Sequence, residues 1–196
     1  ITYFKKEERI FSKNKTQAKI QSKYTFNSKD VTFLKNENKL FSKKKSTLLD
    51  NNDNFYNLES FQYFINNKIL KGENTIVISN YKKPKSDKTF FSSAFFNFEN
   101  NEFIGKDTEI NLHRTLFDNE RIVKKDTKDL EKRKIDNFKG KNHPRIYGSS
   151  ASGDQSETII NKGIFTTCKK NDNCPPWSMS AKKITHDKLE KNIIYD

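Results

Sequence analysis

The sequence predicts an all-β protein in which repeated hairpins build one long antiparallel sheet that folds over on itself. Three observations predict this fold. Apolar and polar residues alternate strictly, asparagine-rich turns separate the alternating segments, and a weak repeat recurs about every 30 residues. Hydrophobic residues make up only 32% of the 196 residues. That share is low for the thick core of a compact helical globule, but it suits a thin sheet with a single apolar face.

Alternation with period two begins in the first fifth of the chain. Ala18, Ile20, Tyr24 and Phe26 point to one face, while lysine, glutamine and threonine point to the other. The pattern returns at 31–33, 61–65, 76–78, 96–98 and 110–112. Because successive side chains of a strand point to opposite faces, we expect one shared apolar groove. Its expected residues are Ile20, Tyr24, Phe26, Val31, Phe33, Phe61, Tyr63, Ile76, Ile78, Phe96, Phe98, Ile110 and Leu112.

Turns are predicted where asparagines interrupt the alternation. Asn66-Asn67 and Asn100-Asn101 stand at the tips of two hairpins, and residues 36–38 form a longer tip of the same kind. Asparagine tolerates a positive φ better than most residues, and a tight primed turn requires it. We therefore expect primed turns at both Asn-Asn pairs.

An internal repeat links these hairpins. "TYFKKEERIFSKNKT" from Thr2 aligns without gaps with "TFLKNENKLFSKKKS" from Thr32. Apolar pairs recur at 10–11, 40–41, 69–70 and 103–104. One such unit cannot bury its apolar face alone, so the units must stack into a continuous sheet.

Three segments interrupt or end the pattern within what we expect to be a single domain over 1–196. Residues 121–143 are highly charged and indicate an exposed insertion or loop, and 82–88 indicate a shorter one. The Gly- and Ser-rich stretch after Arg145 predicts a turn that leads into a further strand. A final hairpin is expected from Ser178–Ile184 and Asn192–Asp196.

The net charge of +13 allows two interpretations. It fits an anionic partner, such as nucleic acid or an acidic lipid surface. It also fits an AT-rich genome, because lysine far outnumbers arginine and asparagine is abundant. No apolar run reaches the roughly 18 residues of a membrane helix. Ile1 is not a natural start, so we expect the chain to be part of a longer protein.

Catalytic and metal-binding signatures are missing from the sequence. His113, His143 and His186 are scattered, without carboxylates or thiols at metal-ligand spacing. No phosphate-binding loop or nucleophile elbow occurs. We therefore expect no enzyme, no cofactor and no metal. Nucleic acid is not expected either, because arginine is scarce and the rings share a face with aliphatic residues.

The two cysteines, Cys168 and Cys174, are separated by five residues. In an oxidising compartment they would bond to each other or to cysteines elsewhere in a longer chain. A local bridge would close a small loop and stabilise little. Two reduced thiols are the third possibility.

Four motifs near the end of the chain carry a resemblance to a known family. They are "HPRIYG" from His143, "KGIFTTC" from Lys162, "CPPWSMSAKKITHD" from Cys174 and "KNIIYD" from Lys191. In this order the segment resembles the OstA-like N-terminal periplasmic domain of LptD, the lipopolysaccharide-assembly outer-membrane protein, in its alphaproteobacterial form. The earlier part of the chain is similar only in its repeated hairpins.

The resemblance implies a β-taco, or open β-jellyroll, on the periplasmic side of the bacterial outer membrane. In this family, lipopolysaccharide passes from the bridge protein LptA to a C-terminal barrel that binds the lipoprotein LptE. The acyl chains run in an apolar groove, and we expect the lipid phosphates at a lysine-bearing rim. A barrel is expected after residue 196. Cys168 matches a family cysteine that bonds to the barrel, and Cys174 is an extra position, so the pairing stays open.

Two functions are therefore to be tested. The first is a non-enzymatic conduit that passes lipopolysaccharide across the periplasm. The second is a periplasmic scaffold that joins partner proteins by sheet-edge addition, without lipid.

Overall fold

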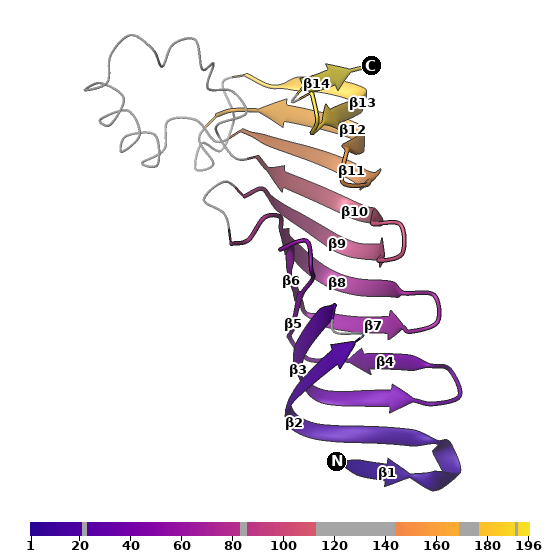
Figure 1. Cartoon of the computed structure of the whole chain (residues 1–196). Coiled ribbons are helices and arrows are strands. Elements are labelled where there is room, and N and C mark those ends of the chain that lie inside the picture. The colour runs from indigo at the N-terminus through magenta and orange to yellow at the C-terminus, as the bar shows by residue number, and fades with distance from the viewer. Residues whose placement is uncertain (21–22, 83–85, 113–143, 169–176, 191) are drawn as a thin grey trace, which may run out of the picture.

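In a computed structural model, the described part of the chain forms one antiparallel sheet of fourteen strands (Figure 1). The structure describes residues 1–20, 23–82, 86–112, 144–168, 177–190 and 192–196. A single 3-10 turn, η1 (Lys5–Glu7), is the only helical element among these residues. The strands are β1 (Thr2–Phe4), β2 (Arg9–Ile20), β3 (Tyr24–Leu34), β4 (Lys39–Ser42), β5 (Ser46–Leu49), β6 (Phe55–Leu58), β7 (Ser60–Phe64), β8 (Ile69–Ile78), β9 (Lys88–Asn97), β10 (Glu102–Asn111), β11 (Arg145–Gly153), β12 (Glu157–Thr166), β13 (Met179–Asp187) and β14 (Asn192–Tyr195).

Neighbouring hairpins stack along the sheet from β1 at one end to β14 at the other (Figure 1). The β4–β5 and β6–β7 pairs are the two halves of interrupted strands. β4 pairs with β3 and β7, while β5 pairs with β3 and β6. The sheet therefore runs continuously across both interruptions.

The long strands bend about midway along their length. Residues with positive φ stand at the bend in β2, β3, β8, β10 and β12, namely Asn14, Asp30, Asn74, Asp107 and Lys162. Their side chains also help to join neighbouring bends. Asp30 accepts a hydrogen bond from the Asn14 N–H (3.0 Å), and Asp107 accepts one from the Ser92 hydroxyl (2.7 Å).

The bend divides the sheet into two layers that pack face to face. We call the part that ends in the turns 35–38, 65–68 and 98–101 the hairpin layer, and the other part the loop layer. Rings from the two layers meet in the interior: Phe26 lies 5.5 Å from Tyr63, and Tyr56 lies 5.1 Å from Phe96, between centroids. The folded-over antiparallel sheet predicted from the sequence is confirmed.

One continuous row of residues on the inner face of the sheet crosses the hairpin layer from end to end, and its first two members, Tyr3 and Ile10, are exposed. Each member is the antiparallel partner of the next, so all of them share one face. In order along the sheet, the row is Tyr3, Ile10, Phe33, Leu40, Tyr63, Leu70, Phe96, Phe103, Gly153, Thr158, His186 and Ile193.

The repeat seen in the sequence has a structural counterpart at the turns. Glu8, Asn38, Lys68 and Asn101 all have positive φ, at 45°, 44°, 53° and 61°. The carbonyl of each of the first three accepts a hydrogen bond from the next hairpin. The donors are the N–H groups of Lys35 (3.0 Å), Ile65 (2.9 Å) and Phe98 (3.0 Å). The stacked hairpins are thus tied together tip to tip.

The turn type differs from the sequence prediction. Primed two-residue turns at Asn66-Asn67 and Asn100-Asn101 would need positive φ at the first residue of each pair, and in type I′ at both residues. Instead, residues 65–68 and 98–101 form four-residue turns whose last residue alone, Lys68 or Asn101, has positive φ. The hydrogen bond between successive tips requires a free carbonyl at this last position, which the longer turn provides.

The Gly- and Ser-rich stretch after Arg145 is not a turn. It belongs to β11, which pairs with β10 and β12 on its two sides. Gly148 is needed there, because a Cβ at this position would overlap the Ile160 side chain. Tertiary pairing overrides the local turn preference. The expected final hairpin is present as β13 and β14. The expected insertion at 121–143 lies outside the described residues.

Candidate functional site

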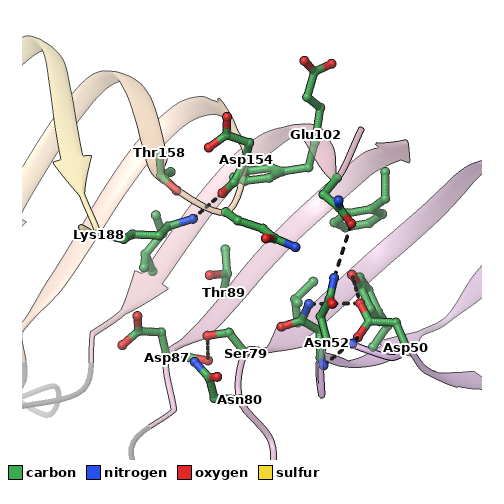
Figure 2. Close-up of a pocket in the computed structure, with 18 of the residues that line it drawn as sticks. Asp50, Asn52, Ser79, Asn80, Asp87, Thr89, Glu102, Asp154, Thr158 and Lys188 are labelled. Carbon is green, nitrogen blue, oxygen red and sulfur yellow. Dashed lines mark hydrogen bonds between the residues drawn. The ribbon is translucent and has the colours of Figure 1, made fainter. Parts of the chain in front are cut away.

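A cavity of about 650 Å³ lies between the two layers, alongside β8–β10 and the hairpin that joins β11 to β12 (Figure 2). Its walls come from both layers and from the loops at their rims. The lining residues are Asp50, Asn52, Asn54, Tyr56, Val77, Ser79, Asn80, Asp87, Thr89, Phe91, Phe96, Phe98, Asn101, Glu102, Phe103, Ile110, Asp154, Gln155, Thr158, His186 and Lys188.

The floor of the cavity is aromatic and aliphatic. Phe91, Phe96 and Phe103 form one ring cluster, with centroids 5.7–6.5 Å apart, and Ile110 lies beside them. Gly105 makes this cluster possible, because a Cβ there would overlap the Phe91 ring. The floor therefore offers hydrocarbon contact without hydrogen-bonding groups.

Phe98 closes the cavity toward the N-terminal end of the sheet. Its ring stacks on Tyr24 at 4.6 Å, and its carbonyl accepts a hydrogen bond from the Tyr24 hydroxyl at 3.4 Å. The two rims also meet where Asn52 donates to the Asn101 side chain at 3.3 Å. Beyond this closure the protein's own side chains fill the interior, as the buried Phe26, Leu48 and Tyr63 show.

Asp50 organises the loop-layer rim of the cavity. Its carboxylate accepts hydrogen bonds from the N–H groups of Asn52 (2.8 Å) and Asn54 (2.9 Å), and from the Tyr56 hydroxyl (3.1 Å). Burial, followed by the nearby Asp50 charge, raises the pKa of Tyr56 well above its usual value. Tyr56 therefore stays a neutral donor that fixes the loop against the cavity wall.

The hairpin-layer rim carries Asp154 and Lys188, which Figure 2 shows side by side. Hydrogen bonds from the Ser156 hydroxyl (2.6 Å) and from the N–H groups of Glu157 and Ser156 lower the pKa of Asp154 to about 2. Lys188 donates through Nζ to the Asp154 carbonyl at 2.6 Å. Burial lowers the pKa of Lys188 from its ordinary value.

His186 and Thr158 stand opposite each other on β13 and β12, at the end of the cavity away from Phe98. Each is only 3% exposed. Nε2 of His186 has no hydrogen-bond partner among the described residues. Burial lowers the pKa of His186, so the ring is uncharged at neutral pH.

The charge at the mouth of the cavity is the reverse of the expected rim. Among the described lining residues, four carry carboxylates, and Lys188 carries the single ammonium group. The four acids are Asp50, Asp87, Glu102 and Asp154. The expected lysine-bearing rim is therefore not found among the described residues of this cavity, although the whole chain has a net charge of +13.

The structure distributes the predicted groove residues over four places. Phe96, Phe98 and Ile110 line the cavity. Phe33 and Val31 lie on β3, half-buried and buried respectively, outside the main cluster. Six others belong to, or pack against, the buried hydrophobic cluster without lining the cavity: Ile20, Tyr24, Phe26, Phe61, Tyr63 and Leu112.

The remaining two predicted groove residues, Ile76 and Ile78, point to the outer face. Ile76 pairs with Asn57, which lies between the inward-facing Tyr56 and Leu58. The bend at Asn74 changes the phase of β8, so that Thr75 and Val77 face inward instead. Sequence alternation missed Val77, Phe91 and Phe103 in the cavity. The adjacent pair Phe90-Phe91 was the one local signal, since two neighbouring rings on a strand must point to opposite faces.

Cys168 is buried, and it forms no disulfide with any residue that the structure describes. Its Sγ lies 3.5 Å from the carbonyl of Trp177, whose ring is 5.8 Å from that of Phe165. Cys174, like His113 and His143, lies outside the described residues. The disulfide connectivity therefore stays a prediction.

Comparison of the sequence with models of protein families and with curated proteins gave no match. Within the described residues, no helix has the length and apolar character needed to cross a bilayer.

Proposed function

We propose that the chain is a non-enzymatic lipid carrier that holds hydrocarbon between the two layers of its folded sheet. The observation that supports this most strongly is the ring-lined cavity of about 650 Å³. Its volume falls within the roughly 300–1,000 Å³ range of ligand pockets. Each methylene group that leaves water for such a floor contributes about 0.8 kcal/mol. Ten methylene groups would therefore supply several kcal/mol of binding free energy.

The continuous inner row supports movement of the lipid, rather than only storage. The row contributes Phe96 and Phe103 to the cavity and continues through His186 to Ile193 beside the C-terminal edge. From Phe96 to Phe103 the contacts stay apolar, so hydrocarbon could shift by one strand there without a deep energy minimum. Gly153, Thr158 and His186 then make the row more polar before it reaches Ile193. In the other direction, Phe98 would have to leave Tyr24 before hydrocarbon could enter the self-filled interior.

The resemblance of residues 143–196 to the OstA-like domain suggests lipopolysaccharide as the lipid. On this proposal the chain works on the periplasmic side of the outer membrane. It would receive lipopolysaccharide from an LptA-type bridge and deliver it to a following barrel with its lipoprotein LptE.

Site-specific photo-crosslinking tests the proposal. Benzoylphenylalanine would replace Phe98 or Phe103 in the cavity, with Lys106 as the matched control on the same strand as Phe103. Lys106 is exposed, on the outer side of the sheet. We expect purified lipopolysaccharide to crosslink at both cavity positions and not at Lys106. Crosslinks confined to Lys106, or none at any position, would overturn the proposal.

A second function, a scaffold that adds partner strands, is favoured by a different observation. Among the described strands, β1 and β14 each have a paired neighbour on one side only. Such an edge presents unpaired N–H and C=O groups to another strand. The scaffold requires Ile193→Pro in β14, which removes an N–H directed to the open edge, to abolish partner binding while cavity probes fail to crosslink lipid.

A further inference from the structure

The end of the cavity at His186 differs chemically from its floor. Thr158 and His186 bring a hydroxyl and an imidazole to the inner row, directly after the apolar Phe96 and Phe103 and the small Gly153. Figure 2 shows Thr158 and Lys188 at this end, next to the loop of Asp154. An acyl chain lying on these rings would therefore have polar side chains of the protein at one end.

Three buried side-chain polar atoms lack a hydrogen-bond partner among the described residues: Thr75 Oγ1, Thr108 Oγ1 and His186 Nε2. Of these three residues, His186 alone lines the cavity, and its free Nε2 therefore indicates a place for a ligand group. Leaving a buried polar atom without a partner costs free energy, and proteins satisfy more than nine in ten such groups. Because the ring is uncharged, it suits a group that both donates and accepts hydrogen bonds. A hydroxyl group is such a partner, whereas a phosphate would gain no opposite charge from the ring.

The surrounding charges also disfavour an anionic head group. Lys188 already donates to the Asp154 carbonyl, and the Asp87 charge also acts on it. Glu102 and Asp50 add negative charge around the mouth. A negatively charged ligand would be repelled there, but an uncharged hydroxylated one would not.

We propose that this end of the cavity binds the uncharged, hydroxyl-bearing sugar of a glycolipid, at the point where its acyl chain begins. The chain lies on Phe91, Phe96 and Phe103, and a sugar hydroxyl hydrogen-bonds with Nε2 of His186. Phosphate groups of the same lipid stay outside the cavity. This inference rests on the proposed function, because it assumes that the cavity takes the hydrocarbon.

Two detergents with the same twelve-carbon chain separate the head-group contribution. Dodecyl maltoside and dodecyl phosphate, both below their micellar concentrations, would be titrated into the 196-residue chain by calorimetry. We expect the maltoside to bind more tightly than the phosphate. His186→Leu should weaken maltoside binding roughly 3–10-fold, the worth of one net hydrogen bond, and change phosphate binding less than twofold.

Three control variants keep the test decisive. His186→Gln retains a donor and an acceptor and should keep most of the maltoside affinity. Thr185→Val, on the outer face of the same strand, should change neither affinity. Thr158→Val probes the same subsite if His186→Leu fails to fold, and it should weaken maltoside binding selectively.

The outcomes distinguish the two proposals. Tighter binding of the phosphate than of the maltoside, or an equal loss of both affinities in the His186→Leu and Thr158→Val variants, overturns the sugar subsite and leaves the lipid cavity standing. If neither detergent binds, the lipid cavity itself is overturned.

Discussion

At the residue scale, the aromatic floor of the cavity depends on one glycine, Gly105. Gly105 stands on the inner face of β10, with the Phe91 ring directly over it. A methyl group at Gly105 must displace a buried ring that is 2% exposed and contacts Phe96 and Phe103. The small residue therefore shapes the cavity as much as the large ones do.

Gly105→Ala should lower the free energy of unfolding by about 1–3 kcal/mol, the usual cost of overpacking. Chemical denaturation would measure the change. Lys106→Ala, the next residue on the outer face, serves as the control and should stay within about 0.5 kcal/mol. Adding Phe91→Leu should recover part of the loss, because the smaller side chain makes room for the methyl group. A Gly105→Ala variant as stable as the parent would show that Phe91 is not held in place.

At the element scale, the mid-strand bends determine which residues face the interior. In β8, Leu70 faces inward before Asn74, and Thr75 and Val77 do so after it. The left-handed conformation of Asn74 (φ 44°) shifts the alternation by one residue. Without that shift, Ile76 would enter the interior in place of Val77.

Asn74→Val should destabilise the protein by about 1–2 kcal/mol, because a β-branched residue is strained in the left-handed region. Asn74→Gly should be nearly neutral, since glycine adopts this conformation without steric cost. Asn57→Val, an exposed strand position without positive φ, is the matched control. Equal loss of stability in the valine and glycine variants would contradict the role assigned to the backbone at Asn74.

These bends also explain which features could be predicted from the sequence. Alternation with period two identified the strands and the folded sheet, because it reflects burial of one face. It placed Phe96, Phe98 and Ile110 on the cavity face correctly, but it placed Ile76 and Ile78 on the wrong face. A single residue with positive φ inverts the pattern and leaves only a weak local signal, since asparagine and aspartate also occur in turns.

The cavity itself could not be predicted from the pattern. Whether rings from two layers fill the space between them depends on pairs distant in sequence, such as Tyr24 with Phe98 or Leu58 over Gly72. Alternation gives the same signal for the filled part around Tyr63 and for the hollow part around Phe103. The acidic mouth of the cavity could not be predicted from the sequence either, because its carboxylates come from four separate segments.

At the scale of the whole molecule, side chains fill the space between the two layers at the N-terminal end of the sheet, and a cavity lies between the layers further along. The stack of Tyr24 on Phe98 and the hydrogen bond between Asn52 and Asn101 mark the boundary between these parts. The central claim is that hydrocarbon occupies the hollow part, between the two layers.

Isotope-filtered NMR tests this claim most directly. The chain would carry labelled phenylalanine, and its contacts with the methylene protons of bound dodecyl maltoside would be recorded. The account predicts intermolecular contacts to Phe91, Phe96 and Phe103. Contacts confined to Phe95, which is exposed on the outer face, would contradict it.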